Sequence, residues 1–140
     1  MAFKINISDN GKTLKAETEN EALLRMKIGD KLGGDLILAD LDGYELEITG
    51  TSDIAGFPGV KGQIGPQLRG ILLTKNQTGM RNSRHDGLRL KKSVRGEEIS
   101  EKTAQINMKV IKQGKKKFEE LLPKKEKAEE KKESPEAKAA

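Results

Sequence analysis

Three segments of this chain alternate between apolar and polar residues, and this period of two requires a fold built on β-strands. The segments are residues 3–7, 44–48 and 106–110, and each places three large apolar side chains at every second position. Side chains on a strand point alternately to the two faces of a sheet, so each segment presents one apolar face for burial. We therefore expect a half-buried strand at each of the three positions.

Turn residues and helix formers predict the elements between these strands. Asp9-Asn10-Gly11 is typical of a tight hairpin turn, with a return strand over 13–16. Residues 20–32 carry helix formers that stop at two glycines, which predicts a short helix. Residues 70–74 are expected to form a buried strand, and 116–122 two helical turns.

Glycines and prolines indicate how these short elements are joined. Residues 50–70 contain six glycines and two prolines, a composition of turns and bends. Several short strands with glycine turns predict a mainly β fold, specifically a small β-barrel with one short helix in its N-terminal half. We expect residues 1–114 to form this β-barrel domain, and residues 115–140 to be a short helix followed by a disordered tail rich in Lys and Glu.

The charge of the chain is divided unevenly along its length. Residues 1–60 contain six Lys/Arg and eleven Asp/Glu, whereas residues 61–96 contain nine Lys/Arg and one Asp. Residues 97–140 are nearly balanced, with twelve Lys/Arg and ten Asp/Glu. This separation indicates one face directed toward a polyanion and another toward solvent. The strand over 44–48, with Glu45 and Glu47 on its outer face, is expected to lie on the solvent side.

The densest basic stretch, residues 78–96, has the character of an RNA-binding segment. It carries four Arg and two Lys against Asp86 alone, and a planar guanidinium suits bidentate contacts to phosphate. Because it has no aromatic residue to stack on bases, contacts are expected mainly to the backbone and 2′-hydroxyls of folded RNA. With two cations upstream, the predicted RNA-binding residues are Lys61, Arg69, Arg81, Arg84, His85, Arg89, Lys91, Lys92 and Arg95. The plainer interpretation is a solvated charged loop.

Catalysis and cofactor binding find no support in the residue types present. The chain has one His and no Cys, and we expect His85 to hydrogen-bond RNA because no nucleophile and base pair is evident. The glycine-rich stretch 59–66 lacks the Gly-Lys-Ser/Thr ending of a phosphate-binding loop, so its glycines are interpreted as bends. We predict no catalytic residue, cofactor, metal or small-molecule substrate.

The absence of cysteine and of long apolar runs indicates the cellular compartment of the protein. Without cysteine the chain has no disulfide and no thiolate metal site. No apolar run approaches the ~20 residues needed to span a bilayer, and residues 1–20 lack a hydrophobic signal region. We expect a cytoplasmic protein with no membrane partner.

Several short motifs together resemble a known family. Residues 86–96 have the sequence DGLRLKKSVRG, and upstream lie Gly43-Tyr44, Ile48-Thr49-Gly50, Ser52-Asp53 and Gly56-Phe57-Pro58. This combination resembles the archaeal and eukaryotic small-subunit ribosomal protein six of the e type, in its short archaeal form. The similarity is strongest over 43–96, fainter over the remaining residues up to 114 and not recognisable from 115 onward.

The resemblance implies a non-enzymatic β-barrel embedded in small-subunit ribosomal RNA, with neighbouring ribosomal proteins as further partners and the cytoplasmic ribosome as its location. It also implies that the basic residues of 81–95 contact RNA. The chain departs from the family's usual residues at two positions. Thr51 stands where a second glycine usually follows Gly50, and Gly59 stands where Met usually follows Gly-Phe-Pro. The long basic C-terminal helix and serine cluster of eukaryotic members are also missing.

The sequence alone is compatible with a second function. The chain is also compatible with a barrel module of a translation or RNA-processing factor, which would bind RNA transiently and recruit a protein through its acidic face.

Overall fold

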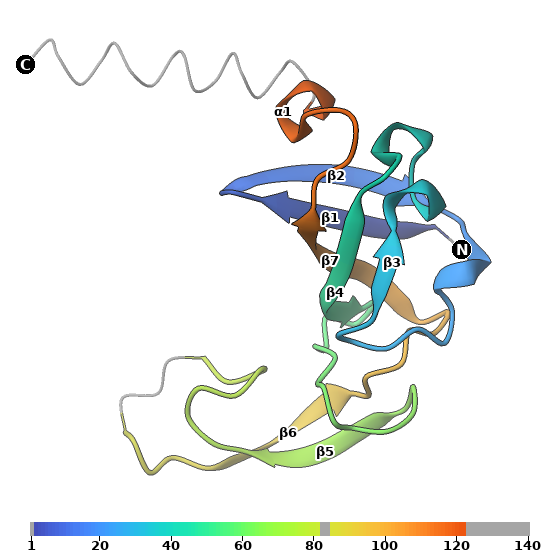
Figure 1. The fold of residues 1–140 in the computed structure, drawn as a ribbon. Helices are drawn as coiled ribbons and strands as arrows, with labels where there is room; N and C mark the ends of the chain where they lie inside the picture. Colours follow the sequence, from blue (N-terminus) through green and yellow to red (C-terminus); the bar gives the residue numbers. More distant parts are fainter. Residues whose placement is uncertain (1, 82–84, 123–140) are drawn as a thin grey trace, which may run out of the picture.

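A mixed five-stranded sheet forms the body of the protein (Figure 1). We describe a computed structural model, which covers residues 2–81 and 85–122. The strand order is β2-β1-β7-β4-β3, with β1 and β7 parallel and the other neighbours antiparallel. In chain order the strands are β1 (Phe3–Asp9), β2 (Lys12–Thr18), β3 (Lys31–Gly33), β4 (Glu45–Asp53) and β7 (Thr103–Lys112). The prediction of a mainly β fold is confirmed.

The alternating segments are strands with one buried face, as predicted. β1 and β2 pair across a turn in which Asn10 and Gly11 both have positive φ, at 46° and 81°. Such angles match the twist of a two-residue hairpin. The apolar residues of the three alternating segments are buried in a single core. They are Phe3, Ile5, Ile7, Tyr44, Leu46, Ile48, Ile106, Met108 and Val110.

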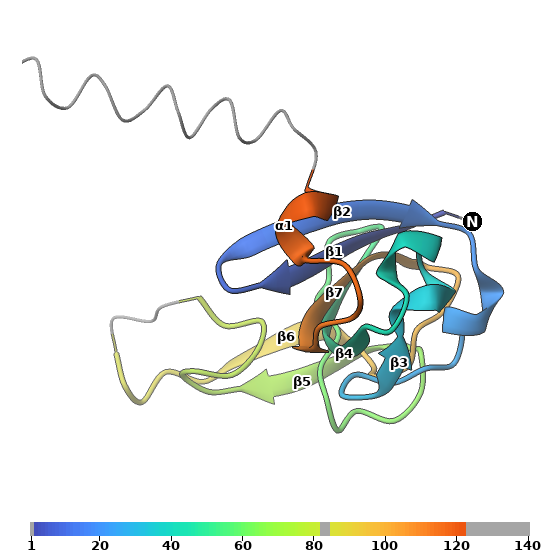
Figure 2. The same ribbon diagram turned by 45° about the horizontal axis from the view of Figure 1, so that its top comes forward.

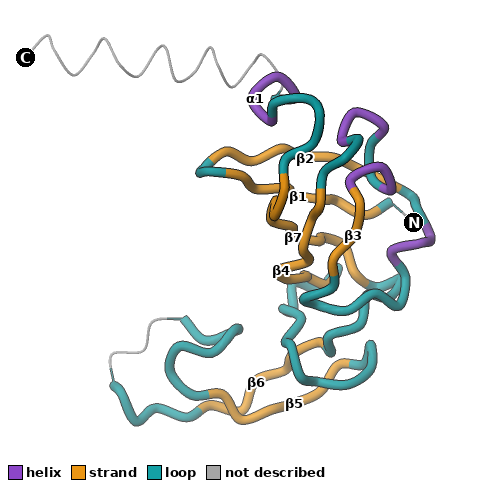
Figure 3. The backbone as a smooth tube through the Cα atoms, in the orientation of Figure 1, coloured by secondary structure: helices purple, strands orange, loops and turns teal. Residues whose placement is uncertain are grey.

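The predicted closed barrel is not what the strand pairing shows. β2 and β3 are the outer strands of the sheet, and no pairing between them is present among the described residues. The two strands β5 (Leu68–Leu73) and β6 (Leu90–Arg95) form a separate antiparallel hairpin instead of joining the sheet. The sheet is therefore open, and its curvature is visible in Figure 3.

The prediction of a helix over residues 20–32 is wrong. The segment forms a 3₁₀ turn, Glu21–Leu23, followed by irregular chain and then β3. Backbone hydrogen bonds to the segment before β7 hold it extended: the amides of Arg25 and Ile28 donate to the carbonyls of Ile99 and Glu97 at 3.0 and 3.1 Å. Burial of Leu23 and Ile28 against the sheet outweighs the intrinsic preference for helix. Two further 3₁₀ turns, Gly34–Leu36 and Ala39–Leu41, connect β3 to β4.

The β5–β6 hairpin projects from the end of the sheet where β4 finishes and β7 begins (Figure 1). The strand predicted over 70–74 is present as part of β5, but the prediction that it is buried is wrong, since Leu68 and Leu72 of β5 are 44% and 59% exposed. Within the two strands, only Leu73 of β5 and Val94 of β6 are fully buried. The predicted long irregular loop is confirmed for the residues between β4 and β5.

The chain after β7 packs back onto the body. The predicted C-terminal helix is present but shorter than the two turns expected over 116–122, because α1 (Phe118–Leu121) has four residues. Phe118 is part of the buried core. Figure 2 shows α1 beside the β1–β2 hairpin, where Lys12 Nζ and a Glu119 carboxylate oxygen are 2.7 Å apart. The predicted tail lies beyond the described residues.

Candidate nucleic-acid interface

The predicted RNA-binding residues lie on and around the projecting hairpin. Lys61 belongs to the loop before β5, Arg69 to β5, and Lys91, Lys92 and Arg95 to β6. Arg81, His85 and Arg89 lie in the connection between the two strands, and Arg84 falls outside the described residues. We call β5, β6 and their connection, residues 68–95, the basic hairpin.

The sequence suggested that the cations lie on one face. The basic hairpin instead carries them on both of its faces. Residues directly opposite in an antiparallel pair share a face. Arg69 is opposite Val94, and Lys92 is opposite Ile71, so these two cations share the partly buried face. Lys91 is opposite Leu72 on the other, exposed face. The hairpin therefore presents positive charge from both sides.

Five of the predicted residues are exposed and have no ion-pair partner among the described residues. Lys61, Arg69, Arg81, Arg89 and Lys91 are exposed, and none of them forms an ion pair with a described residue. Lysines elsewhere differ, because several are paired with acids of the body. Their pairs are Lys27–Glu97, Lys112–Glu45, Lys115–Asp42 and Lys116–Asp40.

Lys92 and the acid of the basic stretch help to shape the connection between β5 and β6. Lys92 Nζ donates to the carbonyl of Gly79 at 3.3 Å, and a Cβ on Gly79 would lie 3.3 Å from Leu73 and 3.7 Å from Val94. The chain near Gly79 thus covers the buried side chains of the hairpin. Asp86 forms an ion pair with Lys75, which is a second tie across this connection.

Arg95 occupies a different environment from the other predicted residues. Its guanidinium forms an ion pair with Asp53, and Nη1 donates to the carbonyl of Pro66 at 3.1 Å. The two charged side chains are only 12% and 4% exposed. Arg95 therefore ties the hairpin to the end of β4 and to the loop before β5. Sequence reasoning assigned no role to Asp53, although it lies in one of the motifs that carry the resemblance.

The glycine-rich loop is bound to the protein itself. The amide of Gly62 donates to a carboxylate oxygen of Glu97 at 2.9 Å, and Glu97 N donates to the carbonyl of Gln63 at 2.9 Å. Gly62 and Gly65 have φ of 90° and 92°, which favours glycine at both positions. An amide that already binds a carboxylate does not cradle a phosphate, so the interpretation of this loop as a set of bends is supported.

The acidic face is also less open than the sequence suggested. Glu45 and Glu47 are half-buried rather than fully exposed. Glu45 pairs with Lys112 at 2.9 Å, and Glu47 has Lys31 and Lys109 as its neighbours on the adjoining strands. Lysines thus interrupt the acidic surface that was expected to face solvent.

Clusters of metal-ligating side chains and membrane-crossing helices were sought in the described part of the chain. Within residues 2–81 and 85–122, no group of three or more His, Cys, Asp or Glu side chains is placed to hold a metal ion. No helix in the same residues is long and apolar enough to cross a bilayer.

Comparison with known proteins places the chain in a family. The family model described as ribosomal protein S6e matches residues 1–123. The chain belongs to the ribosomal protein S6e family. The match extends beyond the motifs of residues 43–96 to include β1, β2 and α1, so the whole body described above is the S6e domain.

Individual S6e relatives align with this chain over most of their length. A small ribosomal subunit protein eS6 from Methanococcus maripaludis (strain C6) is 42% identical over 116 residues, which cover 81% of this chain and 90% of the relative. Proteins of the same name from Methanothermobacter thermautotrophicus and Nanoarchaeum equitans are 42% and 41% identical. These alignments cover 87% and 84% of this chain, and 96% and 87% of the relatives.

Proposed function

We propose that this S6e family member, a structural and non-enzymatic constituent of the small ribosomal subunit, holds folded ribosomal RNA through its basic hairpin. The observation that carries the proposal is the set of exposed, unpaired cations on and beside an element that projects from the sheet. Phosphate groups are the counterions that such a set lacks. The cytoplasmic ribosome is its place of action.

The charge distribution favours RNA over solvent as the environment of the hairpin. A two-stranded hairpin is only marginally stable by itself, and this one buries few side chains. Cations on both of its faces repel one another unless anions lie between or around them. An RNA groove that receives the hairpin would supply anions on both sides, whereas a flat acidic surface would neutralise only one.

The roles of the predicted residues divide accordingly. We propose phosphate or ribose contacts for Lys61, Arg69, Arg81, Arg89 and Lys91, which the described acids leave unpaired. Lys92 and Arg95 would contribute chiefly by shaping the element that carries the others, because both already bind protein atoms. Neighbouring ribosomal proteins are proposed partners of the remaining surface. A transient factor that recruits proteins through an acidic face is less well supported, since lysines interrupt that face.

A triple substitution tests the RNA contact. Arg81→Ala, Arg89→Ala and Lys91→Ala in one protein should weaken binding to a small-subunit ribosomal RNA transcript about tenfold to a hundredfold, at roughly 0.5–1 kcal/mol for each lost ionic contact. Binding is measured by filter retention at fixed salt, and circular dichroism checks that the fold is retained.

The control removes the same amount of charge from the sheet. Lys4, Lys15 and Lys31 are exposed and unpaired with described acids, and they lie on β1, β2 and β3. Their combined replacement by Ala should change affinity less than threefold. Equal losses for the two triple variants would mean that net charge, not the hairpin, governs binding, and the proposal would then be wrong.

A further inference from the structure

One face of the basic hairpin carries an apolar strip that the described part of the chain leaves uncovered. Leu68, Gly70 and Leu72 occupy alternate positions of β5, so they share one face of the hairpin. Leu68 and Leu72 are 44% and 59% exposed, whereas Leu73, on the opposite face, is fully buried. We call the face with Leu68 and Leu72 the outer face.

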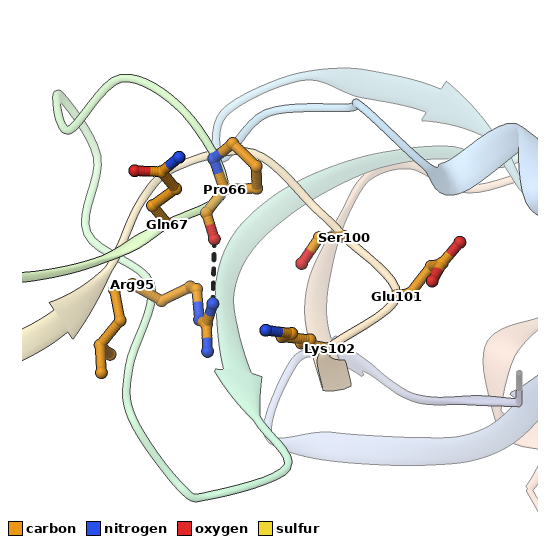
Figure 4. Close-up of a pocket in the computed structure, with 7 residues that line it drawn as sticks. Pro66, Gln67, Arg95, Ser100, Glu101 and Lys102 are labelled. Atoms are coloured by element: carbon orange, nitrogen blue, oxygen red, sulfur yellow. Dashed lines mark hydrogen bonds between the residues drawn. The ribbon is translucent and has the colours of Figure 1, made fainter.

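β6 adds a polar and cationic row to the outer face. The residues opposite Leu68, Gly70 and Leu72 are Arg95, Ser93 and Lys91. Arg95 is turned toward the body, where it pairs with Asp53 and donates from Nη1 to the Pro66 carbonyl at 3.1 Å (Figure 4). Lys91 is exposed and forms no ion pair with a described residue. Neither strand contains Asp or Glu, so the outer face has an apolar row beside a positive one.

Gly70 makes the apolar strip shallow. A Cβ at this position would lie 3.2 Å from Cε and 3.9 Å from Cγ of Lys91, so the aliphatic stem of the lysine lies over the glycine. The stem thus occupies the gap between the two leucines. The backbone does not require glycine here, because the φ of Gly70 is not positive. The missing side chain therefore shapes the surface and not the path of the chain.

The size and charge of the outer face argue against a protein as its partner. Each side of a stable protein interface contributes roughly 800 Å², far more than two leucines and one lysine stem can supply. Single exposed leucines are ordinary on protein surfaces. These two share their face with an unpaired lysine, on strands without an acid. Their partner must therefore bring apolar groups and anions close together.

An RNA double helix offers this combination in its minor groove. The minor groove of A-form RNA is wide and shallow, whereas the major groove is too deep and narrow for side chains to read. Riboses with apolar C–H groups line the minor groove, and phosphates lie along its edges. Leucines against ribose would leave the ammonium group of Lys91 beside a phosphate. The shallow strip is therefore complementary to this groove in both shape and charge.

We propose that the outer face packs against the minor groove of a ribosomal RNA helix, with Leu68 and Leu72 against riboses and the stem of Lys91 between them. The inference rests on the proposed function for its choice of RNA. It assigns part of the binding to uncharged side chains, whose contribution salt does not screen. It also states which face of the hairpin meets paired RNA.

Removal of the two leucine side chains tests the apolar contact. Leu68→Ala with Leu72→Ala in the full-length protein should weaken binding to a small-subunit ribosomal RNA transcript about tenfold, because both side chains lose apolar surface that RNA would bury. The dependence of affinity on salt should keep the wild-type slope, since no cation is removed. The matched control is Leu36→Ala with Ile111→Ala, two residues of the body that are 42% and 38% exposed. It should leave the affinity unchanged.

A second variant tests the shape of the strip. Gly70→Val adds apolar surface and suits a β-strand, but its side chain would displace the stem of Lys91 and stand up between the leucines. It should weaken binding to the transcript, with circular dichroism confirming that the fold is retained. Unchanged or tighter binding would overturn the fit to a shallow groove.

Hydroxyl-radical footprinting identifies the part of the RNA that the outer face contacts, because it reports the accessibility of riboses. The wild-type protein should protect riboses on both strands of a base-paired segment, and the double leucine variant should lose that protection. Protection confined to unpaired nucleotides would overturn the assignment to a minor groove. A double leucine variant that bound the transcript normally but was lost from reconstituted small subunits would assign the strip to a protein partner, and the inference would be wrong.

The variant with Ala at Arg81, Arg89 and Lys91 separates this inference from the proposed function. If that variant bound weakly while the double leucine variant bound normally, the proposed function would stand and the strip would have no role. If only the double leucine variant bound weakly, the leucine contact would stand and the phosphate contacts of the hairpin would be lost.

Discussion

Thr51 and Gly59, the two positions that the resemblance marks as departures from the family's usual residues, lie against each other. Gly59 N donates to the carbonyl of Thr51 at 3.0 Å. A Cβ on Gly59 would overlap the Thr51 hydroxyl and would lie 3.1 Å from Cδ1 of Ile28. Only one of the two positions therefore has space for a side chain. The two positions are therefore sterically coupled, because a side chain at Gly59 would need the space that the Thr51 hydroxyl fills.

This coupling predicts a rescue. Gly59→Met alone should destabilise the protein by about 1–3 kcal/mol, because it overfills a closed space. Adding Thr51→Gly should recover at least about 1 kcal/mol of that loss, although glycine in a strand has its own cost. Urea unfolding of the two single variants and the double variant measures the coupling energy.

A glycine with open surroundings provides the control for the rescue. Gly33 has no atom within 4 Å of the position of a Cβ and no positive φ. Gly33→Met combined with Thr51→Gly should show additive effects. Additivity in the Gly59 pair as well would show that the contact between these positions has no energetic weight.

Side-chain hydrogen bonds and ion pairs attach the segment that joins β7 to α1 to the body of the protein. The Tyr44 hydroxyl donates to the carbonyl of Lys116, and Lys116 Nζ lies 2.6 Å from a carboxylate oxygen of Asp40. Lys115 pairs with Asp42, and Phe118 is buried. Burial raises the pKa of Tyr44, with the nearby carboxylates of Asp9 and Glu120 adding to the effect. The hydrogen bond and charge of Asp42 raise the pKa of Lys115.

These pKa directions predict weakened attachment at alkaline pH. A raised pKa means that the fold favours the protonated form, so the contribution of Tyr44 is complete below its ordinary pKa of 10.0 and is lost as the pH rises through its folded value. Lys115 acts in the same direction above 10.5. Tyr44→Phe should cost about 1 kcal/mol at neutral pH. It should also reduce the loss of stability between roughly pH 10 and 11.

Tyr44 is the only tyrosine of the chain, so its phenolate absorbance follows this titration directly. Urea unfolding at neutral and alkaline pH gives the stabilities of wild type and variant. Parallel stability curves for the two proteins above pH 10 would contradict the assigned role of the hydroxyl.

The same comparison of elements shows what the sequence could predict. β1, β4 and β7 could be predicted because each buries one face, and a strand of this kind alternates between apolar and polar residues. β6 was missed because its residues alternate only weakly, and it forms by pairing with β5 rather than by covering the core. The helix predicted over 20–32 failed because hydrogen bonds to residues 97–99, distant in sequence, hold that segment extended. Site residues were chosen by charge alone, which does not distinguish the enclosed Arg95 from the exposed Arg89.

At the scale of the whole molecule, the body and the basic hairpin differ in how far their charges are paired. In the body, acids lie beside lysines, whereas the cations of the hairpin have few acids near them. The acids of residues 40–45 are matched by the lysines of residues 112–116, all within the body. The basic hairpin keeps an excess of positive charge, with Asp86 as its one acid. Salt should therefore act mainly on RNA binding and only weakly on the fold, because exposed pairs contribute little to stability.

This separation predicts a steep salt dependence that belongs to the hairpin. If about six cations neutralise phosphates, the logarithm of the association constant should fall against the logarithm of salt concentration with a slope of roughly −4. The variant with Ala at Arg81, Arg89 and Lys91 has three of these cations removed, so its slope should be shallower by about 2. The variant with Ala at Lys4, Lys15 and Lys31 should keep the wild-type slope, although its net charge is the same. Slopes that track net charge in both variants would place the phosphate contacts over the whole surface and contradict a role confined to the hairpin.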